Sequence, residues 1–300
     1  MSPEEITQAI DSFSPDARKK LLTVINSKED KFKGVILAEN VQIIATYLKQ
    51  PVEELMVRLL PLGSLYARPP ISKFKVGAVS RGESGNLYFG ANLEFIGQAL
   101  SMSVHAEQSA VNNAWLNGET GLSSIAINYL PCGSCRQFLN ELVTAASLKI
   151  LLPNKPVRRL TDLLPEPFSP SDLGVKGGLM MAHNHNFQLQ KSSNDALVLA
   201  ALSAANKSYA PYSKGYSGIA LFTTDGTIYT GRYAENVAFN PSMSPLQSAL
   251  SQLNLGGNVY QDIQRVVLVE RLASECSQVD VSRNVLKPVC NVTLEVVYVN

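Results

Sequence analysis

Apolar residues in the first part of the chain recur at the three- and four-residue spacing of amphipathic helices. Ile6, Ile10 and Phe13 share one such face and similar faces follow, so we expect a small helical segment over residues 1–48. A further helix is expected over residues 52–66, because one proline precedes it and two prolines follow soon after it. The chain is therefore predicted to begin with helices.

The pattern then changes to short apolar runs of β-strand length. The first two runs are separated by a glycine-containing segment, which favours a hairpin, and two helix-length stretches alternate with the later runs. The expected strands cover residues 74–79, 87–89, 125–129 and 149–152, and the expected helices start with Ser103 as N-cap and at Cys135. This order of elements predicts a layered α/β fold with a mixed sheet.

Two short motifs lie where helices of this unit are expected to begin. The first, V-H-A-E, contains His105 and Glu107, and the second, P-C-G-S-C, contains Cys132 and Cys135. One imidazole and two thiolates are typical zinc ligands, and three protein ligands leave one position open, as in catalytic zinc sites. No fourth Cys or His lies near either motif. We therefore expect a catalytic Zn²⁺ held by His105, Cys132 and Cys135.

Glu107 follows the histidine by two residues and is expected to act as general acid and base beside the metal. Each motif alone is weak evidence, because a C-x-x-C pair also occurs in redox proteins and in structural zinc sites. Together, in this order and with the proline, they match the signature of zinc-dependent deaminases that act on nucleobases.

Composition narrows the class of substrate. The 300 residues are 45% hydrophobic, enough for two domains, and 26 basic side chains against 25 acidic ones give a formal net charge of +1. Such a charge attracts no polyanion, so a small neutral substrate is favoured over nucleic acid. No apolar run approaches the ~20 residues of a membrane helix, and the first residues do not resemble a secretory leader. We expect no membrane partner, a cytoplasmic location, and reduced Cys276 and Cys290.

The second half of the chain repeats the first. Gly218 corresponds to Gly77 and Glu235 to Glu94 at a constant offset of 141 residues, and after a two-residue deletion Gln247 corresponds to Gln108. The repeat predicts that the fold is duplicated.

The chemistry of the first half is missing from this repeat. Its counterparts of His105, Glu107 and Cys132 are Ser244, Leu246 and Ala273, and only Cys276 survives, opposite Cys135. Because one thiolate cannot hold zinc, we expect one zinc per chain and a second half without catalysis.

These observations predict four parts of the chain. They are a helical segment at 1–48, a catalytic domain at 49–152, a proline-rich linker at 153–190 and a degenerate domain at 191–300. His183 and His185 lie in the linker. An H-x-H pair can bind a metal, but with no third ligand nearby a solvated loop is favoured.

The motifs resemble those of the cytidine deaminase family, in particular its long bacterial type, in which a catalytic domain is followed by a degenerate copy. The resemblance rests on residues 74–78, 90–95, 104–108, 131–138, 233–236 and 245–247. It implies a duplicated helix/sheet/helix sandwich and a homodimer. It also implies deamination of cytidine or 2′-deoxycytidine to the corresponding uridine with release of ammonia, as in pyrimidine salvage.

The resemblance also implies a set of nucleoside contacts. Phe74 would stack on the base, Asn92 and Glu94 would bind the ribose 3′-hydroxyl, and the backbone at Ala106 and Cys132 would contact the base edge. Tyr129 and Phe168 are weaker candidates for lining the pocket. The alternatives are ordinary structural roles: Phe74 as a core aromatic, and Asn92 and Glu94 as turn residues.

Two other functions remain open at this point. One is deamination of cytosine within nucleic acid, against which the near-zero net charge argues. The other is a zinc-stabilised binding module without catalysis, against which the open zinc position and Glu107 argue.

Overall fold

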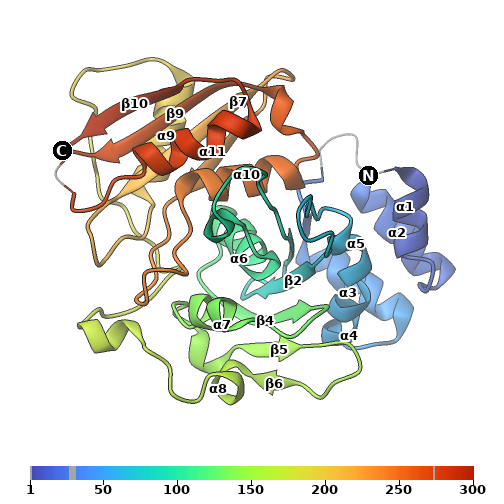
Figure 1. Cartoon of the computed structure of the whole chain (residues 1–300). Coiled ribbons are helices and arrows are strands. Elements are labelled where there is room, and N and C mark those ends of the chain that lie inside the picture. The colour runs from blue at the N-terminus through green and yellow to red at the C-terminus, as the bar shows by residue number, and fades with distance from the viewer. Residues whose placement is uncertain (1, 27–31, 273) are drawn as a thin grey trace.

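Two β-sheets, one in each half of the chain, organise the computed structural model, which describes residues 2–26, 32–272 and 274–300 (Figure 1). The six strands of the first sheet are ordered β1-β3-β2-β4-β5-β6, and the four of the second are ordered β10-β9-β7-β8. The first sheet contains β1 (Val35–Ile36), β2 (Gly77–Gly82), β3 (Leu87–Ala91), β4 (Leu122–Ile127), β5 (Lys149–Leu151) and β6 (Arg158–Arg159). The second contains β7 (Ser217–Thr223), β8 (Ile228–Arg232), β9 (Ile263–Arg271) and β10 (Leu294–Val299).

Helices pack against both sheets. In the first half they are α1 (Pro3–Ala9), α2 (Pro15–Ile25), α3 (Ala38–Leu48), α4 (Val52–Arg58), α5 (Leu60–Ser64), α6 (Ala106–Leu116), α7 (Gly133–Leu139) and α8 (Leu160–Leu163). In the second half they are α9 (Ala196–Asn206), α10 (Pro245–Leu255) and α11 (Val279–Val289). None of the helices that the structure describes is long and apolar enough to cross a membrane.

The first sheet is the middle layer of a sandwich. Strands β2, β3 and β4 are antiparallel neighbours, whereas β4 and β5 run parallel, so the sheet is mixed as predicted. Because successive strand residues point to opposite faces, Val79 and Phe89 pack into a core with the first five helices, while Ala78 and Tyr88 pack into the core that contains α6. The expected helix/sheet/helix sandwich is confirmed.

The duplication is confirmed in the strand pairing. The β2–β3 hairpin pairs Gly77 with Ala91, and the β7–β8 hairpin pairs Gly218 with Arg232, the same pair of positions shifted by the sequence offset. In both halves the hairpin is followed by a helix, an antiparallel strand, another helix and a parallel strand.

The first 66 residues differ from the expectation in two respects. The segment predicted as purely helical also contains β1, which adds an edge strand to β3. The helix expected over residues 52–66 is divided into α4 and α5 near Pro61, because proline has no amide hydrogen to continue the helical bonding of α4.

The segment 153–190, predicted as a linker, is partly ordered into the first half. Strand β6 pairs with β5, and Leu160 and Leu163 of α8 are buried. The solvated loop expected around the two histidines is wrong. The His185 ring lies 3.8 Å from that of Tyr216, and its Nε2 donates to the Ser208 carbonyl at 2.9 Å, so this stretch packs against the second half.

Helices α6 and α10 meet at the junction of the two halves (Figure 1). Their facing sides are buried and polar: Ser109 Oγ and Ser251 Oγ are 2.7 Å apart, and Ser248 Oγ donates to Asn112 Oδ1 at 2.6 Å. Buried polar groups need such partners, so these contacts fix the relative position of the two helices. One hydrophobic core runs through both halves.

Candidate active site

The first segment that carries a predicted zinc ligand is the start of α6. His105, in extended conformation, is the N-cap of this helix, and its backbone N–H donates to Gln108 Oε1 at 3.0 Å. The prediction that Ser103 is the N-cap is wrong. The Ser103 hydroxyl donates to the carbonyl of Leu100, three residues earlier, and caps no helix N–H. Starting the helix at His105 puts Glu107 in the first turn, where the residue is only 4% exposed.

The second segment that carries predicted zinc ligands is the start of α7. Cys132 is the N-cap of this helix, and its Sγ accepts a hydrogen bond from the backbone N–H of Cys135 at 3.4 Å. Arg136 Nε donates to the Pro131 carbonyl at 2.8 Å and holds the turn that leads into the helix. The C-x-x-C spacing thus places both thiols within the first turn of one short helix.

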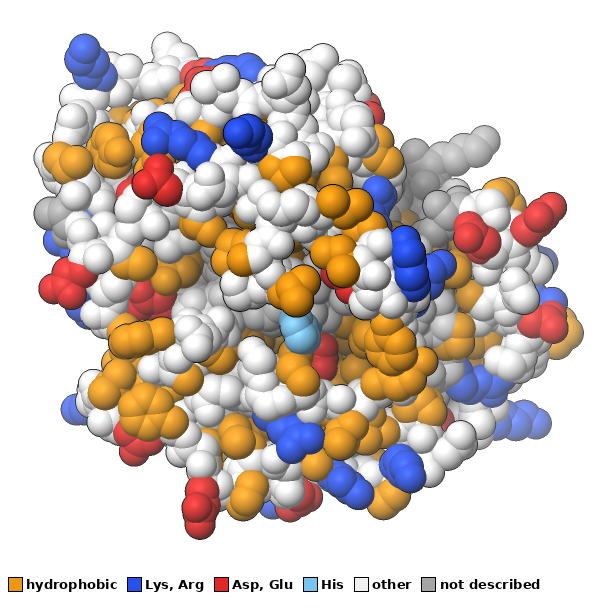
Figure 2. Space-filling model, in the orientation of Figure 1, with side chains coloured by type: hydrophobic (Ala, Val, Ile, Leu, Met, Phe, Trp, Pro, Cys, Tyr) orange, Lys and Arg blue, Asp and Glu red, His pale blue; other side chains and the backbone are white. Residues whose placement is uncertain are grey.

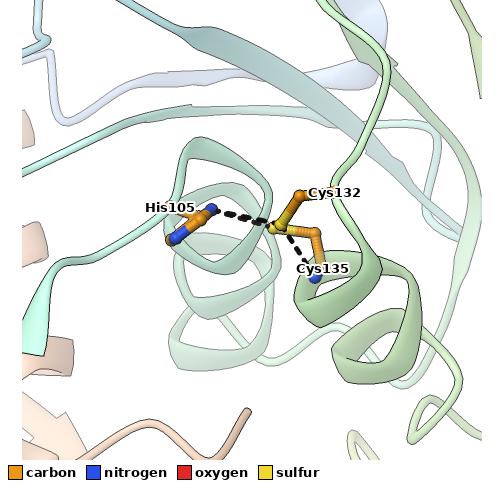
Figure 3. Close-up of side chains that lie close together, drawn as sticks. All are labelled: His105, Cys132 and Cys135. Carbon is orange, nitrogen blue, oxygen red and sulfur yellow. Dashed lines mark hydrogen bonds between the residues drawn. The ribbon is translucent and has the colours of Figure 1, made fainter. Parts of the chain in front are cut away.

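The two helix starts bring the three predicted ligands together (Figure 3). His105 Nδ1 lies 3.7 Å from Cys132 Sγ and 3.2 Å from Cys135 Sγ, and the ligand atoms all lie within 4.8 Å of one another. Zinc binds nitrogen at ~2.0 Å and sulfur at ~2.3 Å, so ligand atoms of one ion lie close together in this way. The number and type of donors fit a catalytic zinc site.

The three side chains shift one another's pKa values. Hydrogen bonds from Cys135 and then from His105 lower the pKa of Cys132 to about 3. Contact with Cys132, followed by burial, raises the pKa of Cys135, and the hydrogen bond with Cys132 raises that of His105. Burial raises the pKa of Glu107 beside them. Mutually perturbed groups of this kind are concentrated at functional sites.

A pocket of about 440 Å³ opens beside the cluster. Figure 2 shows a histidine on this face with hydrophobic side chains around it. Of the predicted site residues, those that line the pocket are Phe74, Asn92, Glu94, His105, Ala106, Glu107, Tyr129 and Cys132. Cys135 is buried and does not line the pocket. The volume is in the range of small-molecule sites.

Two aromatic rings stand at the pocket. Phe74 and Tyr129 have ring centroids 4.5 Å apart, and each residue is 49% exposed. Phe74 is therefore not a core aromatic, the alternative considered for it. An exposed aromatic pair in a pocket offers a flat apolar surface on which a planar base can stack.

Asn92 and Glu94 line the pocket and also hold the segment that carries Phe74. The Asn92 side chain accepts from the Val76 N–H and donates to the Phe74 carbonyl, both at 2.9 Å. Glu94 accepts from the backbone N–H groups of Ile71 and Ser72 at 2.8 and 2.9 Å, and from the Ser72 hydroxyl at 2.5 Å. A carboxylate has about four lone pairs, so these three donors leave acceptor capacity toward the pocket.

Phe168 lies outside the lining of this pocket. Its residue is 46% exposed, and its carbonyl accepts from Gln137 Nε2 at 2.6 Å and from Asn140 Nδ2 at 3.2 Å. The helix that carries the two cysteines thus also holds the Phe168 backbone, while the aromatic ring does not line the pocket of its own chain.

The second half has no equivalent of the ligand cluster in the described parts of the chain. Ser244 caps α10 by accepting from the Gln247 N–H at 3.2 Å, and Leu246 is fully buried. Cys276 Sγ lies 4.0 Å from the Tyr233 hydroxyl. Ala273, the expected counterpart of Cys132, lies outside the described residues.

Several lining residues were not expected from the sequence: Ser72, Val76, Ser103, Val104, Ile127 and Leu130. Ser72 could have been found from the repeat. Its counterpart Ser213 makes the same backbone and hydroxyl contacts with Glu235 that Ser72 makes with Glu94.

Comparison with known proteins points to one family. The model of the cytidine and deoxycytidylate deaminase zinc-binding region matches residues 49–148 and again residues 160–283. A cytidine deaminase of Serratia proteamaculans is 49% identical over 255 residues, 85% of this chain and 86% of its own. That of Photorhabdus laumondii is 49% identical over 86% of this chain and 87% of its own. That of Photobacterium profundum is 43% identical over 94% and 95%. Among solved structures, a cytidine deaminase of Mycobacterium tuberculosis is 30% identical over 39% of this chain and 96% of its own, with a TM-score of 0.36.

Proposed function

This chain belongs to the cytidine deaminase family, and we propose that the pocket beside His105, Cys132 and Cys135 is where it converts cytidine and 2′-deoxycytidine to the corresponding uridines and ammonia. It is a zinc-dependent hydrolase of cytidine. The observation that carries the site assignment is the convergence of one imidazole and two thiols beside a buried carboxyl group, Glu107, in a pocket of nucleoside size.

The proposed chemistry is the addition of water at C4 of the base and the loss of the amino group. A zinc ion held by His105, Cys132 and Cys135 would supply a water molecule acidic enough to give up a proton near neutral pH. Glu107 takes this proton and delivers it to N3 of cytosine, which makes C4 more electrophilic. Glu107 then carries the second proton of the water to the departing amino group, so that C4 becomes a carbonyl and ammonia leaves.

The remaining pocket residues bind the nucleoside in this proposal. Phe74, with Tyr129 beside it, stacks on the base, and the backbone at Ala106 contacts the base edge. Asn92 and Glu94 bind the ribose 3′-hydroxyl, in addition to holding the segment that carries Phe74. The lining position of all five residues and the unused acceptor capacity of Glu94 support these roles.

Selectivity among substrates tests this binding mode. We expect 2′-deoxycytidine to be a good substrate and free cytosine a very poor one, because contacts to the sugar position the base for attack. Glu94→Gln should lower kcat/KM for cytidine by about 10- to 100-fold, since a hydrogen bond to a charged group contributes ~1.5–3 kcal/mol. Steady-state kinetics on the three substrates measure both effects.

Glu235→Gln is the matched control for that variant, because Glu235 holds its own loop in the second half with the same contacts. It should alter stability and leave the selectivity for nucleosides intact. Equal kcat/KM values for cytosine and cytidine would rule out the sugar contacts.

We further infer that the enzyme acts as a homodimer in the cytoplasm, in pyrimidine salvage. Four free cysteines, two of them proposed zinc ligands, suit a reducing compartment. Apolar side chains are exposed in segments that flank the pocket, among them Ile71, Ile96 and Leu100. Exposed apolar surface next to a binding site favours a protein partner. In this proposal Phe168 covers the base in the pocket of the partner chain.

Mixing two inactive variants tests whether the site is shared. One chain carries Glu107→Ala and the other Phe168→Asp, and each alone should be severely impaired. After subunit exchange, half of the dimers are mixed and each has one intact site, so about a quarter of wild-type turnover should return. If turnover does not return although exchange is demonstrated by mass, each chain completes its own site.

A further inference from the structure

The second half contacts both segments that supply the proposed zinc ligands. One contact is made by Gln247 on α10 to the segment before His105. The other is made to Gln137 and Glu141, at the end of helix α7, whose N-cap is Cys132; its second-half residues are Tyr209, Tyr212, Asn236 and Val237. We propose that the degenerate half is a positioning device for the metal ligands of its own chain. This inference rests on the zinc assignment above. It goes beyond that assignment because it gives the non-catalytic second half a role in positioning the zinc ligands.

Gln247 acts on the histidine segment. Its Nε2 donates to the backbone carbonyls of Met102 at 2.8 Å and Ser103 at 3.2 Å, three and two residues before His105. Its Oε1 accepts from the backbone N–H of Ser244 at 2.8 Å, so the amide group is held at both ends, and the residue is buried. Gln247 therefore fixes the backbone that leads into the ligand.

Gln108 in the first half makes the contact that corresponds to that of Gln247, so both halves retain it. Gln108, the counterpart of Gln247 in the first half, donates through Nε2 to the Pro241 carbonyl at 3.0 Å, just before Ser244. Ser244 is no metal ligand, so this contact serves the fold alone. The contact made by Gln247 has the same form, but the segment it holds carries a proposed zinc ligand.

Glu141, just beyond helix α7, makes most of the contacts between this helix and the second half. It lies two residues beyond α7 and is fully buried. One carboxylate oxygen accepts from the Tyr209 and Tyr212 hydroxyls at 2.7 and 2.6 Å, and the other accepts from the Val237 N–H at 2.8 Å. All three donors belong to the second half. A buried carboxyl group is costly without such partners, so its position is tightly specified.

A second contact holds the same helix at its last turn. Asn236 Nδ2 donates to the Gln137 carbonyl at 2.9 Å. Helix α7 has seven residues and carries Cys132 and Cys135 at its start, so a shift at its end moves both sulfur atoms. Metal ligands must be held within about 0.5 Å of their working geometry, and fixing both ends of a short helix meets that need.

Zinc release measures this role directly. The variants are Glu141→Gln, which cannot accept from all three donors, and Gln247→Met, which keeps the length of the side chain and loses the amide. Each zinc-loaded variant is mixed with a chromogenic chelator, and the rate of zinc transfer is followed. We expect about tenfold faster release from both, the lower end of the effect of removing groups that orient metal ligands. The absorption spectrum of the cobalt(II)-substituted proteins should also change.

Two controls separate positioning from general stability. Tyr88→Phe removes a buried hydroxyl that donates to Glu119 at 2.8 Å, a contact of the same chemistry away from both ligand segments. Tyr229→Phe removes a buried hydroxyl that donates to Asn258 Oδ1 at 2.7 Å, a contact within the second half and away from both ligand segments. Both should lower the melting temperature and keep the zinc release rate and cobalt spectrum of the wild type. Tyr212→Phe, which leaves Glu141 two donors, provides a milder variant should Glu141→Gln not fold.

The possible outcomes are distinct. Faster release and an altered cobalt spectrum in the Glu141 and Gln247 variants, but not in the controls, supports the proposal. Wild-type release rates in all the folded variants overturn it. If the wild type itself binds no zinc, or keeps it after Cys132→Ala with Cys135→Ala, the zinc assignment has failed and the positioning role fails with it.

Discussion

Replacing Glu107 by alanine should give a folded, zinc-loaded protein that has lost nearly all turnover of cytidine. The three proposed ligands do not include Glu107, so the metal should stay bound. A general acid or base contributes ~10²–10⁴-fold to a rate, and here one carboxyl group serves every proton transfer, so we expect a loss at or above the top of that range. Zinc content and steady-state kinetics of the same sample measure both parts.

Glu119→Ala is the matched control for this prediction. Glu119 is also a buried carboxyl group, just beyond the other end of α6, where it accepts from the Tyr88 hydroxyl at 2.8 Å and from Ser84. Its removal should lower stability while kcat stays near the wild-type value. A Glu107→Ala variant that retained a tenth of wild-type turnover would refute the role of Glu107 as proton carrier.

Each of the two motifs that make up the proposed ligand set could be recognised in the sequence because the geometry within each motif is local. His105 and Cys132 are both helix N-caps, and Cys135 lies one turn after Cys132. Spacing of one or two residues at a helix start fixes the relative position of side chains before any tertiary contact forms. The sequence does not give the exact start of α6, because serine is the commoner N-cap and His105 takes that position here.

Other features depend on contacts that are distant in sequence, and the pattern of a single segment does not reveal them. The two-residue strand β1 is too short to show any alternation, and it forms only because β3 offers it an edge. The polar stretch around His185 reads as a loop, yet its ring packs on Tyr216. The hydrogen bond from Gln247 to the Ser103 carbonyl joins residues that are 144 positions apart in the sequence. Contacts between residues so far apart in the sequence become visible only in the folded structure.

Loss of the two cysteines is the second large effect that we expect. Cys132→Ala together with Cys135→Ala leaves His105 as the sole member of the cluster, and one imidazole cannot hold zinc against the water and buffer around it. Without the metal no acidic water is supplied, so deamination should fall to background. The loss should exceed that of Glu107→Ala, because both the metal and the partner of the proton carrier disappear.

Cys276→Ala is the matched control. Cys276 corresponds to Cys135 in the repeat, but it lies near the Tyr233 hydroxyl and belongs to no group of three potential ligands in the described residues. Its replacement should leave zinc content and turnover unchanged. The comparison therefore separates the loss of a thiol in general from the loss of the proposed ligands.

Zinc per chain and cytidine turnover, measured together on the wild type, the double variant at Cys132 and Cys135, and Cys276→Ala, test the central claim most directly. We predict one zinc per chain and conversion of cytidine to uridine with an equal amount of ammonia in the wild type and in Cys276→Ala. The double variant should show neither metal nor turnover. Two zinc ions per wild-type chain, or zinc and turnover that persist in the double variant, would contradict the assignment of this site.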